Sequence, residues 1–269
     1  MALIEPIARV GLVARGALYI VVGLTAVGVA VGLGGRTTDL HGAVAEVGRF
    51  YAGGVLLLVL ALGLAAYVVW RVAQAIGDLD EHGSGLKGWA MRLGELVSAL
   101  IHFGLALTAG GIAVLGEAGS LRTWVARALS EPLGAWAVGI AGAIVMGVGV
   151  NQFYRAWTVK FEEDLQLGRM SPRAQRWARR VGRFGLAARG VTFLIVGWFL
   201  MRAAFYVSAR EVKDMGEALR VLGAQPYGAW LLGVVACGTI AYGVLSLLEA
   251  RYRRIIKKTG AGTTRPHSG

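Results

Sequence analysis

Charged residues are scarce in this sequence, and their scarcity excludes an ordinary soluble domain. Only 16% of the 269 residues are Asp, Glu, Lys or Arg, well below the roughly 25% of a typical soluble protein. The mean hydropathy is +0.59, and apolar stretches nearly free of charge recur along the chain. Each stretch is long enough for the ~20 residues that cross a bilayer as a helix. The composition therefore predicts an integral membrane protein.

Cysteine and proline are also rare. The single cysteine, Cys237, cannot form a disulfide within the chain or a zinc site built from cysteines, and its apolar surroundings favour a packing role. Five prolines and long apolar stretches favour helices over a transmembrane barrel, which would show short alternating strands. Glycine, by contrast, occurs 41 times, which suits close packing of helices in lipid.

Motifs that would fix a reaction are missing. The sequence contains no zinc-helix motif, no phosphate-binding loop and no Ser–His–Asp set. The acidic segment DLDEH at 78–82 is expected to be a solvated loop, and one span histidine, His102, is too little for a haem. We expect no enzyme activity, no metal and no cofactor. The net charge of +12 does not indicate nucleic-acid binding, because the spans leave no room for a folded basic module.

Six membrane spans are predicted from the apolar stretches. The first contains Arg15 and is too long for the apolar region of a signal peptide, so we expect the mature protein to retain it. The spans cover roughly 10–34, 52–76, 93–116, 133–158, 184–207 and 227–250.

Internal repetition organises these spans. The segment RVGLVARGALYIVVG at 9–23 returns as RFGLAARGVTFLIVG at 183–197, and the spans that follow also match, for example at Gly63 with Gly238 and Tyr67 with Tyr242. A middle copy is more diverged: Arg92 and Gly94 fit the pattern, but Ser98 and Ala99 replace the Arg-Gly pair, and Gly134 lies where Gly53 and Gly228 lie. We predict three units, at 9–76, 92–157 and 183–250, followed by a basic tail at 251–269.

Between the two spans of each unit lies a short amphipathic segment. Asp39, Ser120 and Asp214 begin these segments as predicted N-caps, and apolar residues follow at helical spacing. Gly48 and Gly223 suit a C-terminal stop. Segments of about ten residues are too short to span, so we expect helices lying on the membrane surface; the alternative is a plain polar loop.

The predicted fold is an all-α polytopic membrane bundle: six transmembrane helices arranged as three parallel hairpin repeats, each with a short interfacial helix. Two spans per unit make all units enter from the same side, unlike inverted repeats, and a ring of hairpins with pseudo-threefold symmetry is a natural packing. The repeated Arg-Gly pair, the Gly-Ala-rich segment and the second span punctuated by glycine resemble the bacterial membrane family called domain of unknown function 1206. The resemblance covers about 9–251 and implies six spans in three units, with no catalytic residues to transfer.

Positive residues distinguish the two sides of the predicted bundle. One side, which carries both termini and the loops at 77–92 and 159–183, holds 20 of the 28 Lys and Arg residues. By the positive-inside rule this side is cytoplasmic in a bacterial plasma membrane, and its basic clusters favour anionic lipid headgroups as partners. The other side holds the remaining eight: Arg36, Arg49, Arg122, Arg127, Arg202, Arg210, Lys213 and Arg220.

The candidate site consists of polar residues within the spans. Arg15 lies six residues beyond Arg9, roughly 9 Å deeper along a helix, where a long side chain can extend back to the headgroups. The alternative is that Arg15 and Arg189 turn inward and form a polar cluster with Glu95, whose carboxylate would neutralise one guanidinium and leave the other free for an anionic lipid or a partner's carboxylate. Ser98 and His102 complete the candidate ligand-binding set, although His102 aligns with Tyr19 and Phe193 and is expected to pack as an aromatic ring.

Two functions remain open from the sequence. The first is a non-enzymatic scaffold or accessory protein that binds lipid or another membrane protein. The second is a small transporter or channel with a polar path between the repeats. The absence of acidic residues near the middle of the spans favours the first, because ion-coupled transporters generally carry them there.

The predicted topology is testable with reporter fusions at residue 36 and at the C-terminus. We expect a cytoplasmic signal at the C-terminus and an external signal at residue 36, because one span separates residue 36 from the cytoplasmic N-terminus. Cytoplasmic signals at both positions would contradict the odd number of crossings between them.

Overall fold

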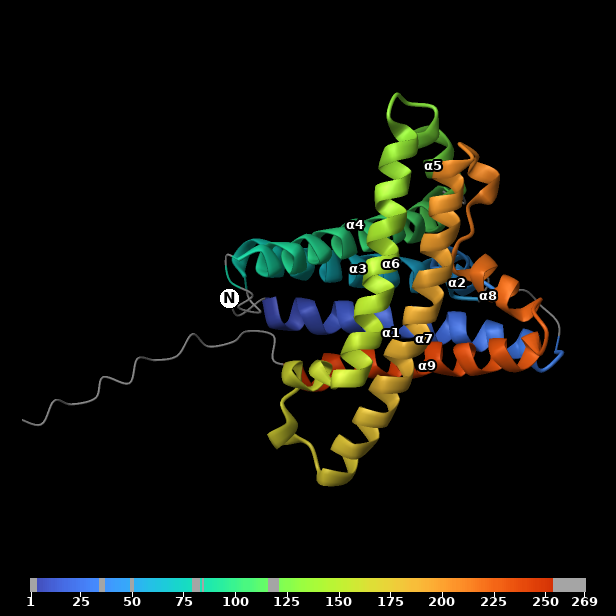
Figure 1. Cartoon of the computed structure of the whole chain (residues 1–269). Coiled ribbons are helices and arrows are strands. Elements are labelled where there is room, and N and C mark those ends of the chain that lie inside the picture. Colours follow the sequence, from blue (N-terminus) through green and yellow to red (C-terminus); the bar gives the residue numbers. More distant parts are fainter. Residues whose placement is uncertain are drawn as a thin grey trace, which may run out of the picture.

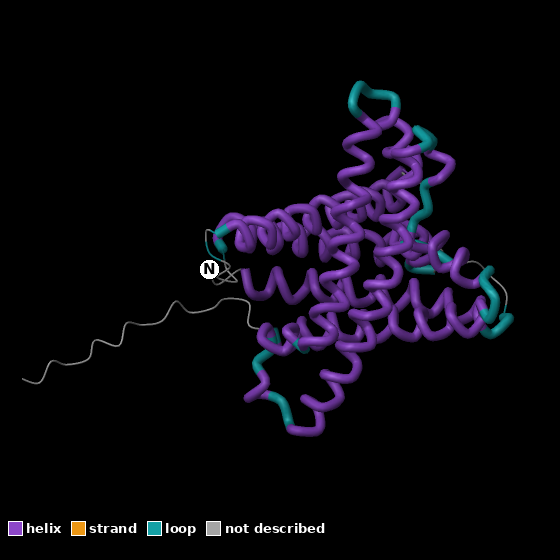
Figure 2. The backbone as a smooth tube through the Cα atoms, in the orientation of Figure 1, coloured by secondary structure: helices purple, strands orange, loops and turns teal. Residues whose placement is uncertain are grey.

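The computed structural model is mainly helical in the part of the chain that it describes, namely residues 4–33, 37–48, 51–78, 83, 85–115 and 121–253. Within these ranges no strand occurs, and one isolated bridge pairs Leu165 with Arg253. Loops lie at the ends of the helices (Figure 2). The acidic segment at 79–82 and the tail from 254 onward lie outside the described residues.

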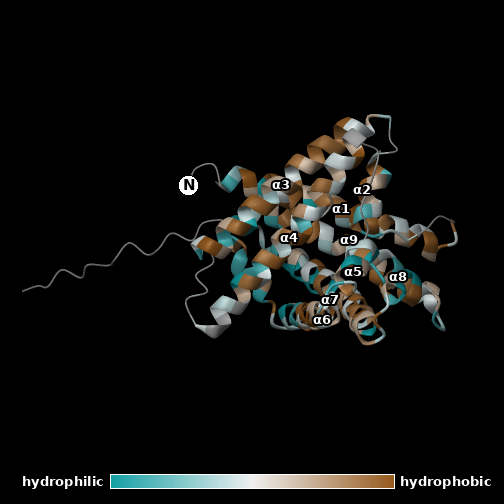
Figure 3. Cartoon of the chain, turned by 90° about the horizontal axis from the view of Figure 1, so that it is seen from above, coloured by the Kyte–Doolittle hydropathy of each residue, from teal (hydrophilic) through white to brown (hydrophobic). Residues whose placement is uncertain are grey.

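Six helices are long and apolar enough to cross a membrane, which confirms the six predicted spans. Hydrophobic residues occur along much of their length (Figure 3). The longest helix starts at Pro172, before the predicted span, because Ser171 caps it and proline suits its first turn. The bounds are α1 (Ile4–Ala30), α3 (Gly53–Gly77), α4 (Leu86–Leu115), α6 (Gly134–Thr158), α7 (Pro172–Phe205) and α9 (Gly228–Tyr252).

In each unit one short helix lies between the two long helices. These are α2 (Leu40–Gly48), α5 (Leu121–Leu129) and α8 (Met215–Gly223). Their presence rules out the plain polar loop. The Asp39 carboxylate accepts a hydrogen bond from the Gly42 amide at 2.7 Å, and Asp214 accepts one from the Glu217 amide at 2.8 Å, so both predicted caps are confirmed. Ser120 lies outside the described residues.

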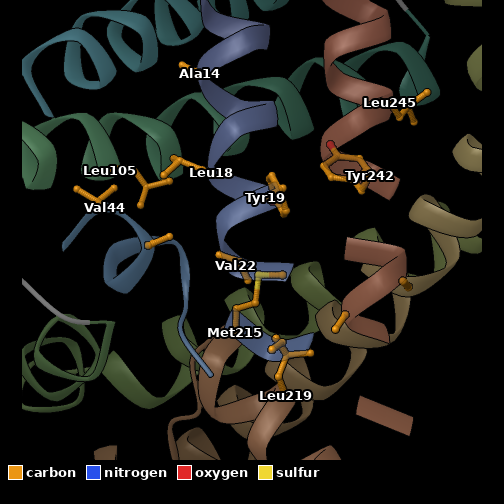
Figure 4. Close-up of a cluster of buried hydrophobic side chains, with 14 of the residues drawn as sticks. Ala14, Leu18, Tyr19, Val22, Val44, Leu105, Met215, Leu219, Tyr242 and Leu245 are labelled. Carbon is orange, nitrogen blue, oxygen red and sulfur yellow. The ribbon is translucent and has the colours of Figure 1, made fainter. Parts of the chain in front are cut away.

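The apolar faces of α2 and α8 contribute to one core with α1 and α9. Figure 4 shows Val44 of α2 beside Leu105 of α4, with Leu18 of α1 next to Leu105, and Met215 and Leu219 of α8 below Val22. The two short helices also meet at their N-termini, where the Thr37 hydroxyl donates to the Gly216 carbonyl at 2.8 Å. The interfacial helices are thus anchored to the spans by burial.

The long helices associate in three pairs that join different units. α1 packs on α9, α4 on α3 and α7 on α6, so the first span of each unit lies against the second span of the preceding one in cyclic order. This is the pairing expected of a ring of three hairpins. The α6–α7 pair runs at a steep angle to the other two pairs (Figure 1).

Packing within the units is unequal. The two long helices of the first unit, α1 and α3, pack together, as do α7 and α9 of the third. Among the described residues, α4 and α6 of the middle unit do not pack along their lengths. The ring is therefore open at the middle unit.

Side-chain size explains this opening. A Cβ atom at Gly63 would lie 2.7 Å from the Ala14 Cβ, and one at Gly238 would lie 2.2 Å from the Ala188 Cβ, so both contacts require glycine. Ten residues after its first glycine, where the other units have Gly63 and Gly238, the middle unit carries Ile144. Its residue corresponding to Ala14 is Val97. Two branched side chains thus replace the small pair that allows close approach.

The cap at α2 is expected to stabilise the fold. Burial alone would raise the pKa of Asp39, but hydrogen bonds from His41 and the Gly42 amide hold it below its ordinary value. Because the folded pKa is lowered, Asp39 stabilises the fold at neutral pH, and this stabilisation is lost as the pH falls through that pKa. We expect Asp39→Ala to lower the free energy of unfolding by about 1 kcal/mol at pH 7, measured by denaturant titration in detergent.

The matched control is Asp39→Asn, which retains a capping oxygen. It should lose less stability than Asp39→Ala and should show a weaker loss on acidification than the wild type. Equal losses in both variants would show that the cap does not stabilise α2.

Candidate functional site

Arg15 lies at the centre of a buried polar cluster between three helices. Only 3% of its surface is exposed, so the alternative in which it extends along the lipid is wrong. Its Nη1 donates to the Tyr67 hydroxyl of α3 at 2.8 Å, its Nε to the Ser246 hydroxyl of α9 at 3.1 Å, and its Nη2 to the Glu249 carboxylate of α9 at 2.5 Å. The guanidinium thus joins the two long helices of its own unit to the second span of the third unit.

Tyr67 extends the cluster toward the end of α3. Its hydroxyl accepts a second hydrogen bond from the Arg71 Nε at 2.8 Å, and both guanidinium groups lie about 5 Å from its ring centre. Arg71 also donates to the Gln74 side chain at 3.1 Å. Two cations therefore share one phenol oxygen, which places several positive charges close together.

A chain of alternating charges continues from Glu249. The Nη1 of Arg253 lies 4.0 Å from the Glu249 carboxylate, and its Nη2 lies 3.9 Å from Asp164. Asp164 also accepts a hydrogen bond from Arg155 of α6 at 3.1 Å. The guanidinium of Arg253 further lies 4.8 Å from the ring centre of Trp70. This chain fixes the end of α9 and the segment after α6 at the side of the bundle where α1 begins and α9 ends, hereafter the terminal side.

Arg189 is the counterpart of Arg15 in the third unit. It repeats the arginine–tyrosine pair, since its Nη1 donates to the Tyr242 hydroxyl at 2.5 Å. Its guanidinium lies 4.5 Å, 4.6 Å and 5.4 Å from the ring centres of Tyr242, Phe193 and Tyr19, respectively. Its Nε is buried and has no hydrogen-bond partner, and no ion pair joins Arg189 to a described carboxylate. The inward direction is thus confirmed for both arginines, but only one has a counter-ion.

The remaining predicted residues lie on α4. Glu95 is buried, but Arg15 bonds to Glu249, so the predicted neutralisation of this guanidinium by Glu95 is wrong. The sequence does not show that partner because Glu249 lies on the last turns of α9, 234 residues along the chain. One part of the cluster does leave a signal in the sequence: a tyrosine, Tyr67 or Tyr242, recurs in each unit that carries the arginine.

His102 packs as an aromatic residue. Its ring centre lies 4.5 Å from that of Tyr67, and its Nδ1 lies 2.8 Å from the Ser98 carbonyl oxygen. Its Nε2 is buried without a hydrogen-bond partner. The Ser98 side chain approaches the Tyr67 hydroxyl, so Ser98 and His102 both contact the Arg15 cluster through Tyr67. Within the described part of the chain, no three His, Cys, Asp or Glu residues are placed to hold a metal ion.

Comparison with known proteins identifies the unit that builds this site. Three stretches, 10–78, 93–159 and 184–253, match the family model described as Domain of Unknown Function (DUF1206). The chain belongs to the DUF1206 family. Each stretch matched by the DUF1206 model contains two long helices and the short helix between them. The uncharacterized protein YxxB of Bacillus subtilis (strain 168) is 30% identical over 254 residues, which cover 94% of this chain and 92% of the relative. No solved structure matches the chain.

The ion pair between Arg15 and Glu249 predicts an asymmetric mutational response. Glu249→Gln leaves a buried guanidinium without its carboxylate, and removal of one partner from a buried pair costs about 3–5 kcal/mol. Replacing both residues by apolar ones, Arg15→Met with Glu249→Leu, removes the charge as well as its partner and should cost less. Unfolding of the purified protein in detergent measures both variants. A double variant as unstable as Glu249→Gln would show that the pair is not the source of the stability.

Proposed function

We propose that this DUF1206 protein is a non-enzymatic scaffold or accessory protein of the bacterial plasma membrane that binds an anionic phospholipid from the inner leaflet. The proposal includes the orientation in which the terminal side faces the cytoplasm. The observation that supports it best is an apolar groove of about 830 Å³ that opens near two arginines. Another membrane protein can then recognise the form of the protein that has a lipid bound in this groove.

The groove lies between α1, α3 and α9. Val10, Val13, Ala17, Val21, Val59 and Gly63 are among the residues that line it. Between Val10 and Val21 it extends about 16 Å along the α1 axis, roughly half of the ~30 Å hydrocarbon core. Val47 of α2 lines it too, so the groove has the length and the apolar walls that an acyl chain of one leaflet requires.

Charge at the mouth favours an anionic headgroup. Arg9 and Arg251 border the groove at the terminal side. Arg9 binds Glu5 and donates to carbonyl oxygens at the end of α9, whereas Arg251 is exposed and forms no ion pair with a described residue. Each basic residue near the surface attracts an anionic lipid by about 1 kcal/mol.

The distribution of polar residues favours a lipid-binding scaffold over a transporter. The Arg15 cluster lies toward the terminal side, whereas farther along α1 the contact with α9 is formed by buried apolar residues such as Val22, Ala26 and Ala236. The buried hydroxyls of Thr192 and Thr239 bond to carbonyls of their own helices. The described residues therefore provide polar groups at one end of this interface rather than along a path through it.

Lipid binding in the groove is testable by native mass spectrometry after reconstitution with phosphatidylglycerol or phosphatidylcholine. We expect preferential retention of phosphatidylglycerol by the wild type, and roughly fivefold weaker retention in Arg251→Gln, which loses one charge near the headgroup. Ala17→Phe should reduce retention of both lipids, because the ring fills the apolar groove.

The matched control for the groove is Ala143→Phe, an equally large change at an exposed position of α6 outside the groove. It should retain lipid as the wild type does. Unchanged retention in Ala17→Phe, or equal retention of the two lipids by the wild type, would contradict the proposal.

A further inference from the structure

The helix pairs α1–α9 and α7–α6 share one register, which makes their residues directly comparable. A Cβ atom at Gly16 would lie 2.9 Å from the Gly243 carbonyl oxygen, and one at Gly190 would lie 3.0 Å from the Gly149 carbonyl oxygen. The two close contacts occupy corresponding positions in the repeats. Arg15 and Arg189 each precede the glycine of the first helix. The two arginines therefore occupy corresponding positions at the two helix contacts.

The second helix of each pair differs where these arginines point. Three and six residues after Gly243, α9 carries Ser246 and Glu249, which accept hydrogen bonds from Arg15. Three and six residues after Gly149, α6 carries Gln152 and Arg155. A cation thus replaces the carboxylate, and Arg155 pairs with Asp164 instead. The absence of a carboxylate beside Arg189 follows from this exchange.

Aromatic rings provide only part of the missing compensation for Arg189. A guanidinium stays protonated in proteins, and a charge inside a membrane bundle is costly unless it is paired. Cation–π contacts attract the guanidinium, but they leave the Nε of Arg189 without an acceptor. One anionic oxygen would complete both the hydrogen bonding and the charge.

Arg189 is half-buried, whereas Arg15 is almost fully buried. Among the described residues, α4 and α6 do not pack along their lengths. The middle unit also lacks its own arginine and tyrosine, because Ser98 and Val148 stand at the positions of Arg15 and Tyr67. The asymmetry of the repeats therefore leaves Arg189, which pairs with no described carboxylate, beside α6 of the middle unit.

We propose that Arg189 is the binding site for a phosphate-type oxyanion, separate from the groove between α1, α3 and α9. The anion takes the place that Glu249 occupies beside Arg15. Its source is a lipid phosphodiester or a free phosphate, since both present the same oxygen acceptors to the guanidinium.

The test uses the full-length protein in neutral detergent and two probes, inorganic phosphate and short-chain phosphatidylglycerol. Thermal unfolding reports binding, because a ligand that binds the folded state raises the melting temperature. We expect a concentration-dependent rise for the wild type with at least one probe. Loss of the charge–oxyanion hydrogen bonds in Arg189→Gln should weaken apparent affinity roughly tenfold or more.

A second variant, Gln152→Glu, tests the proposal without removing the arginine. It places a carboxylate at the position that corresponds to Ser246, so Arg189 acquires an internal counter-ion. We expect this variant to unfold at a higher temperature without a probe and to lose the response to the probes. Arg183→Gln, on the exposed part of α7, is the matched control and should respond as the wild type does.

The outcomes separate the sources and the two sites. A response to phosphate assigns a free oxyanion, and a response to phosphatidylglycerol alone assigns a headgroup. The groove variant Ala17→Phe should leave the phosphate response, or the Arg189-dependent part of the lipid response, unchanged. No response to either probe in the wild type, or an intact response in Gln152→Glu and Arg189→Gln, would overturn the proposal and show that the aromatic rings suffice.

Discussion

The structure depends on one electrostatic constraint: a guanidinium placed inside a membrane bundle must find its partners within the protein. Arg15 meets this requirement with a tyrosine from its own unit and with a serine and a glutamate from the third unit. Its charge therefore joins the first and last units of the chain, α1 to α9, where association by apolar burial alone is weak because lipid tails are equally apolar. Arg15, which interrupts an apolar span, is thus the residue that connects α1 to α9 by hydrogen bonds.

Glycine contacts and the arginine–tyrosine pair occur together in the first and third units, and both are absent from the middle unit. In the first unit Gly63 lies against Ala14 and Arg15 bonds to Tyr67; in the third, Gly238 and Tyr242 repeat these contacts. The middle unit has Ile144, Val97 and Ser98 instead. The arginine–tyrosine hydrogen bond can form only if the two long helices of a unit approach closely, and the small glycine allows that approach. A unit that lacks one of these features therefore has less need of the other. The open middle unit and the steep α6–α7 pair (Figure 1) are consistent with this coupled loss.

Much of the fold was predictable because it rests on local patterns. Span length, N-caps at Asp39 and Asp214, and the repeated Arg-Gly pair are each visible within a few residues. The site was predictable only in part. The repeated Arg-Gly pair left two directions open for Arg15, toward the headgroups or into the bundle. Its pairing with Glu249 depends on which units meet, and repeats alone do not say whether a first span packs on the unit before it or after it. Glu95 of the middle unit was the carboxylate that we expected beside an arginine. Because the units pair cyclically, α1 packs on α9 of the third unit, which provides Glu249 instead.

Repeats of this kind allow function to arise from inequivalence. If all three units carried the arginine, the tyrosine and the glutamate, every guanidinium would be neutralised and the hairpins would close against one another. Here Arg15 has the carboxylate of Glu249 beside it, whereas Arg189 has Arg155 at the corresponding position. In the middle unit, Ser98 stands in place of the arginine. Arg15, with its carboxylate, stabilises the fold. Arg189 has a charge that no described carboxylate balances, and it lies on α7, which packs against α6 of the open middle unit. A charge that costs stability without a partner is best explained where a ligand supplies that partner, which is why Arg189, rather than the more buried Arg15, is the residue expected to bind.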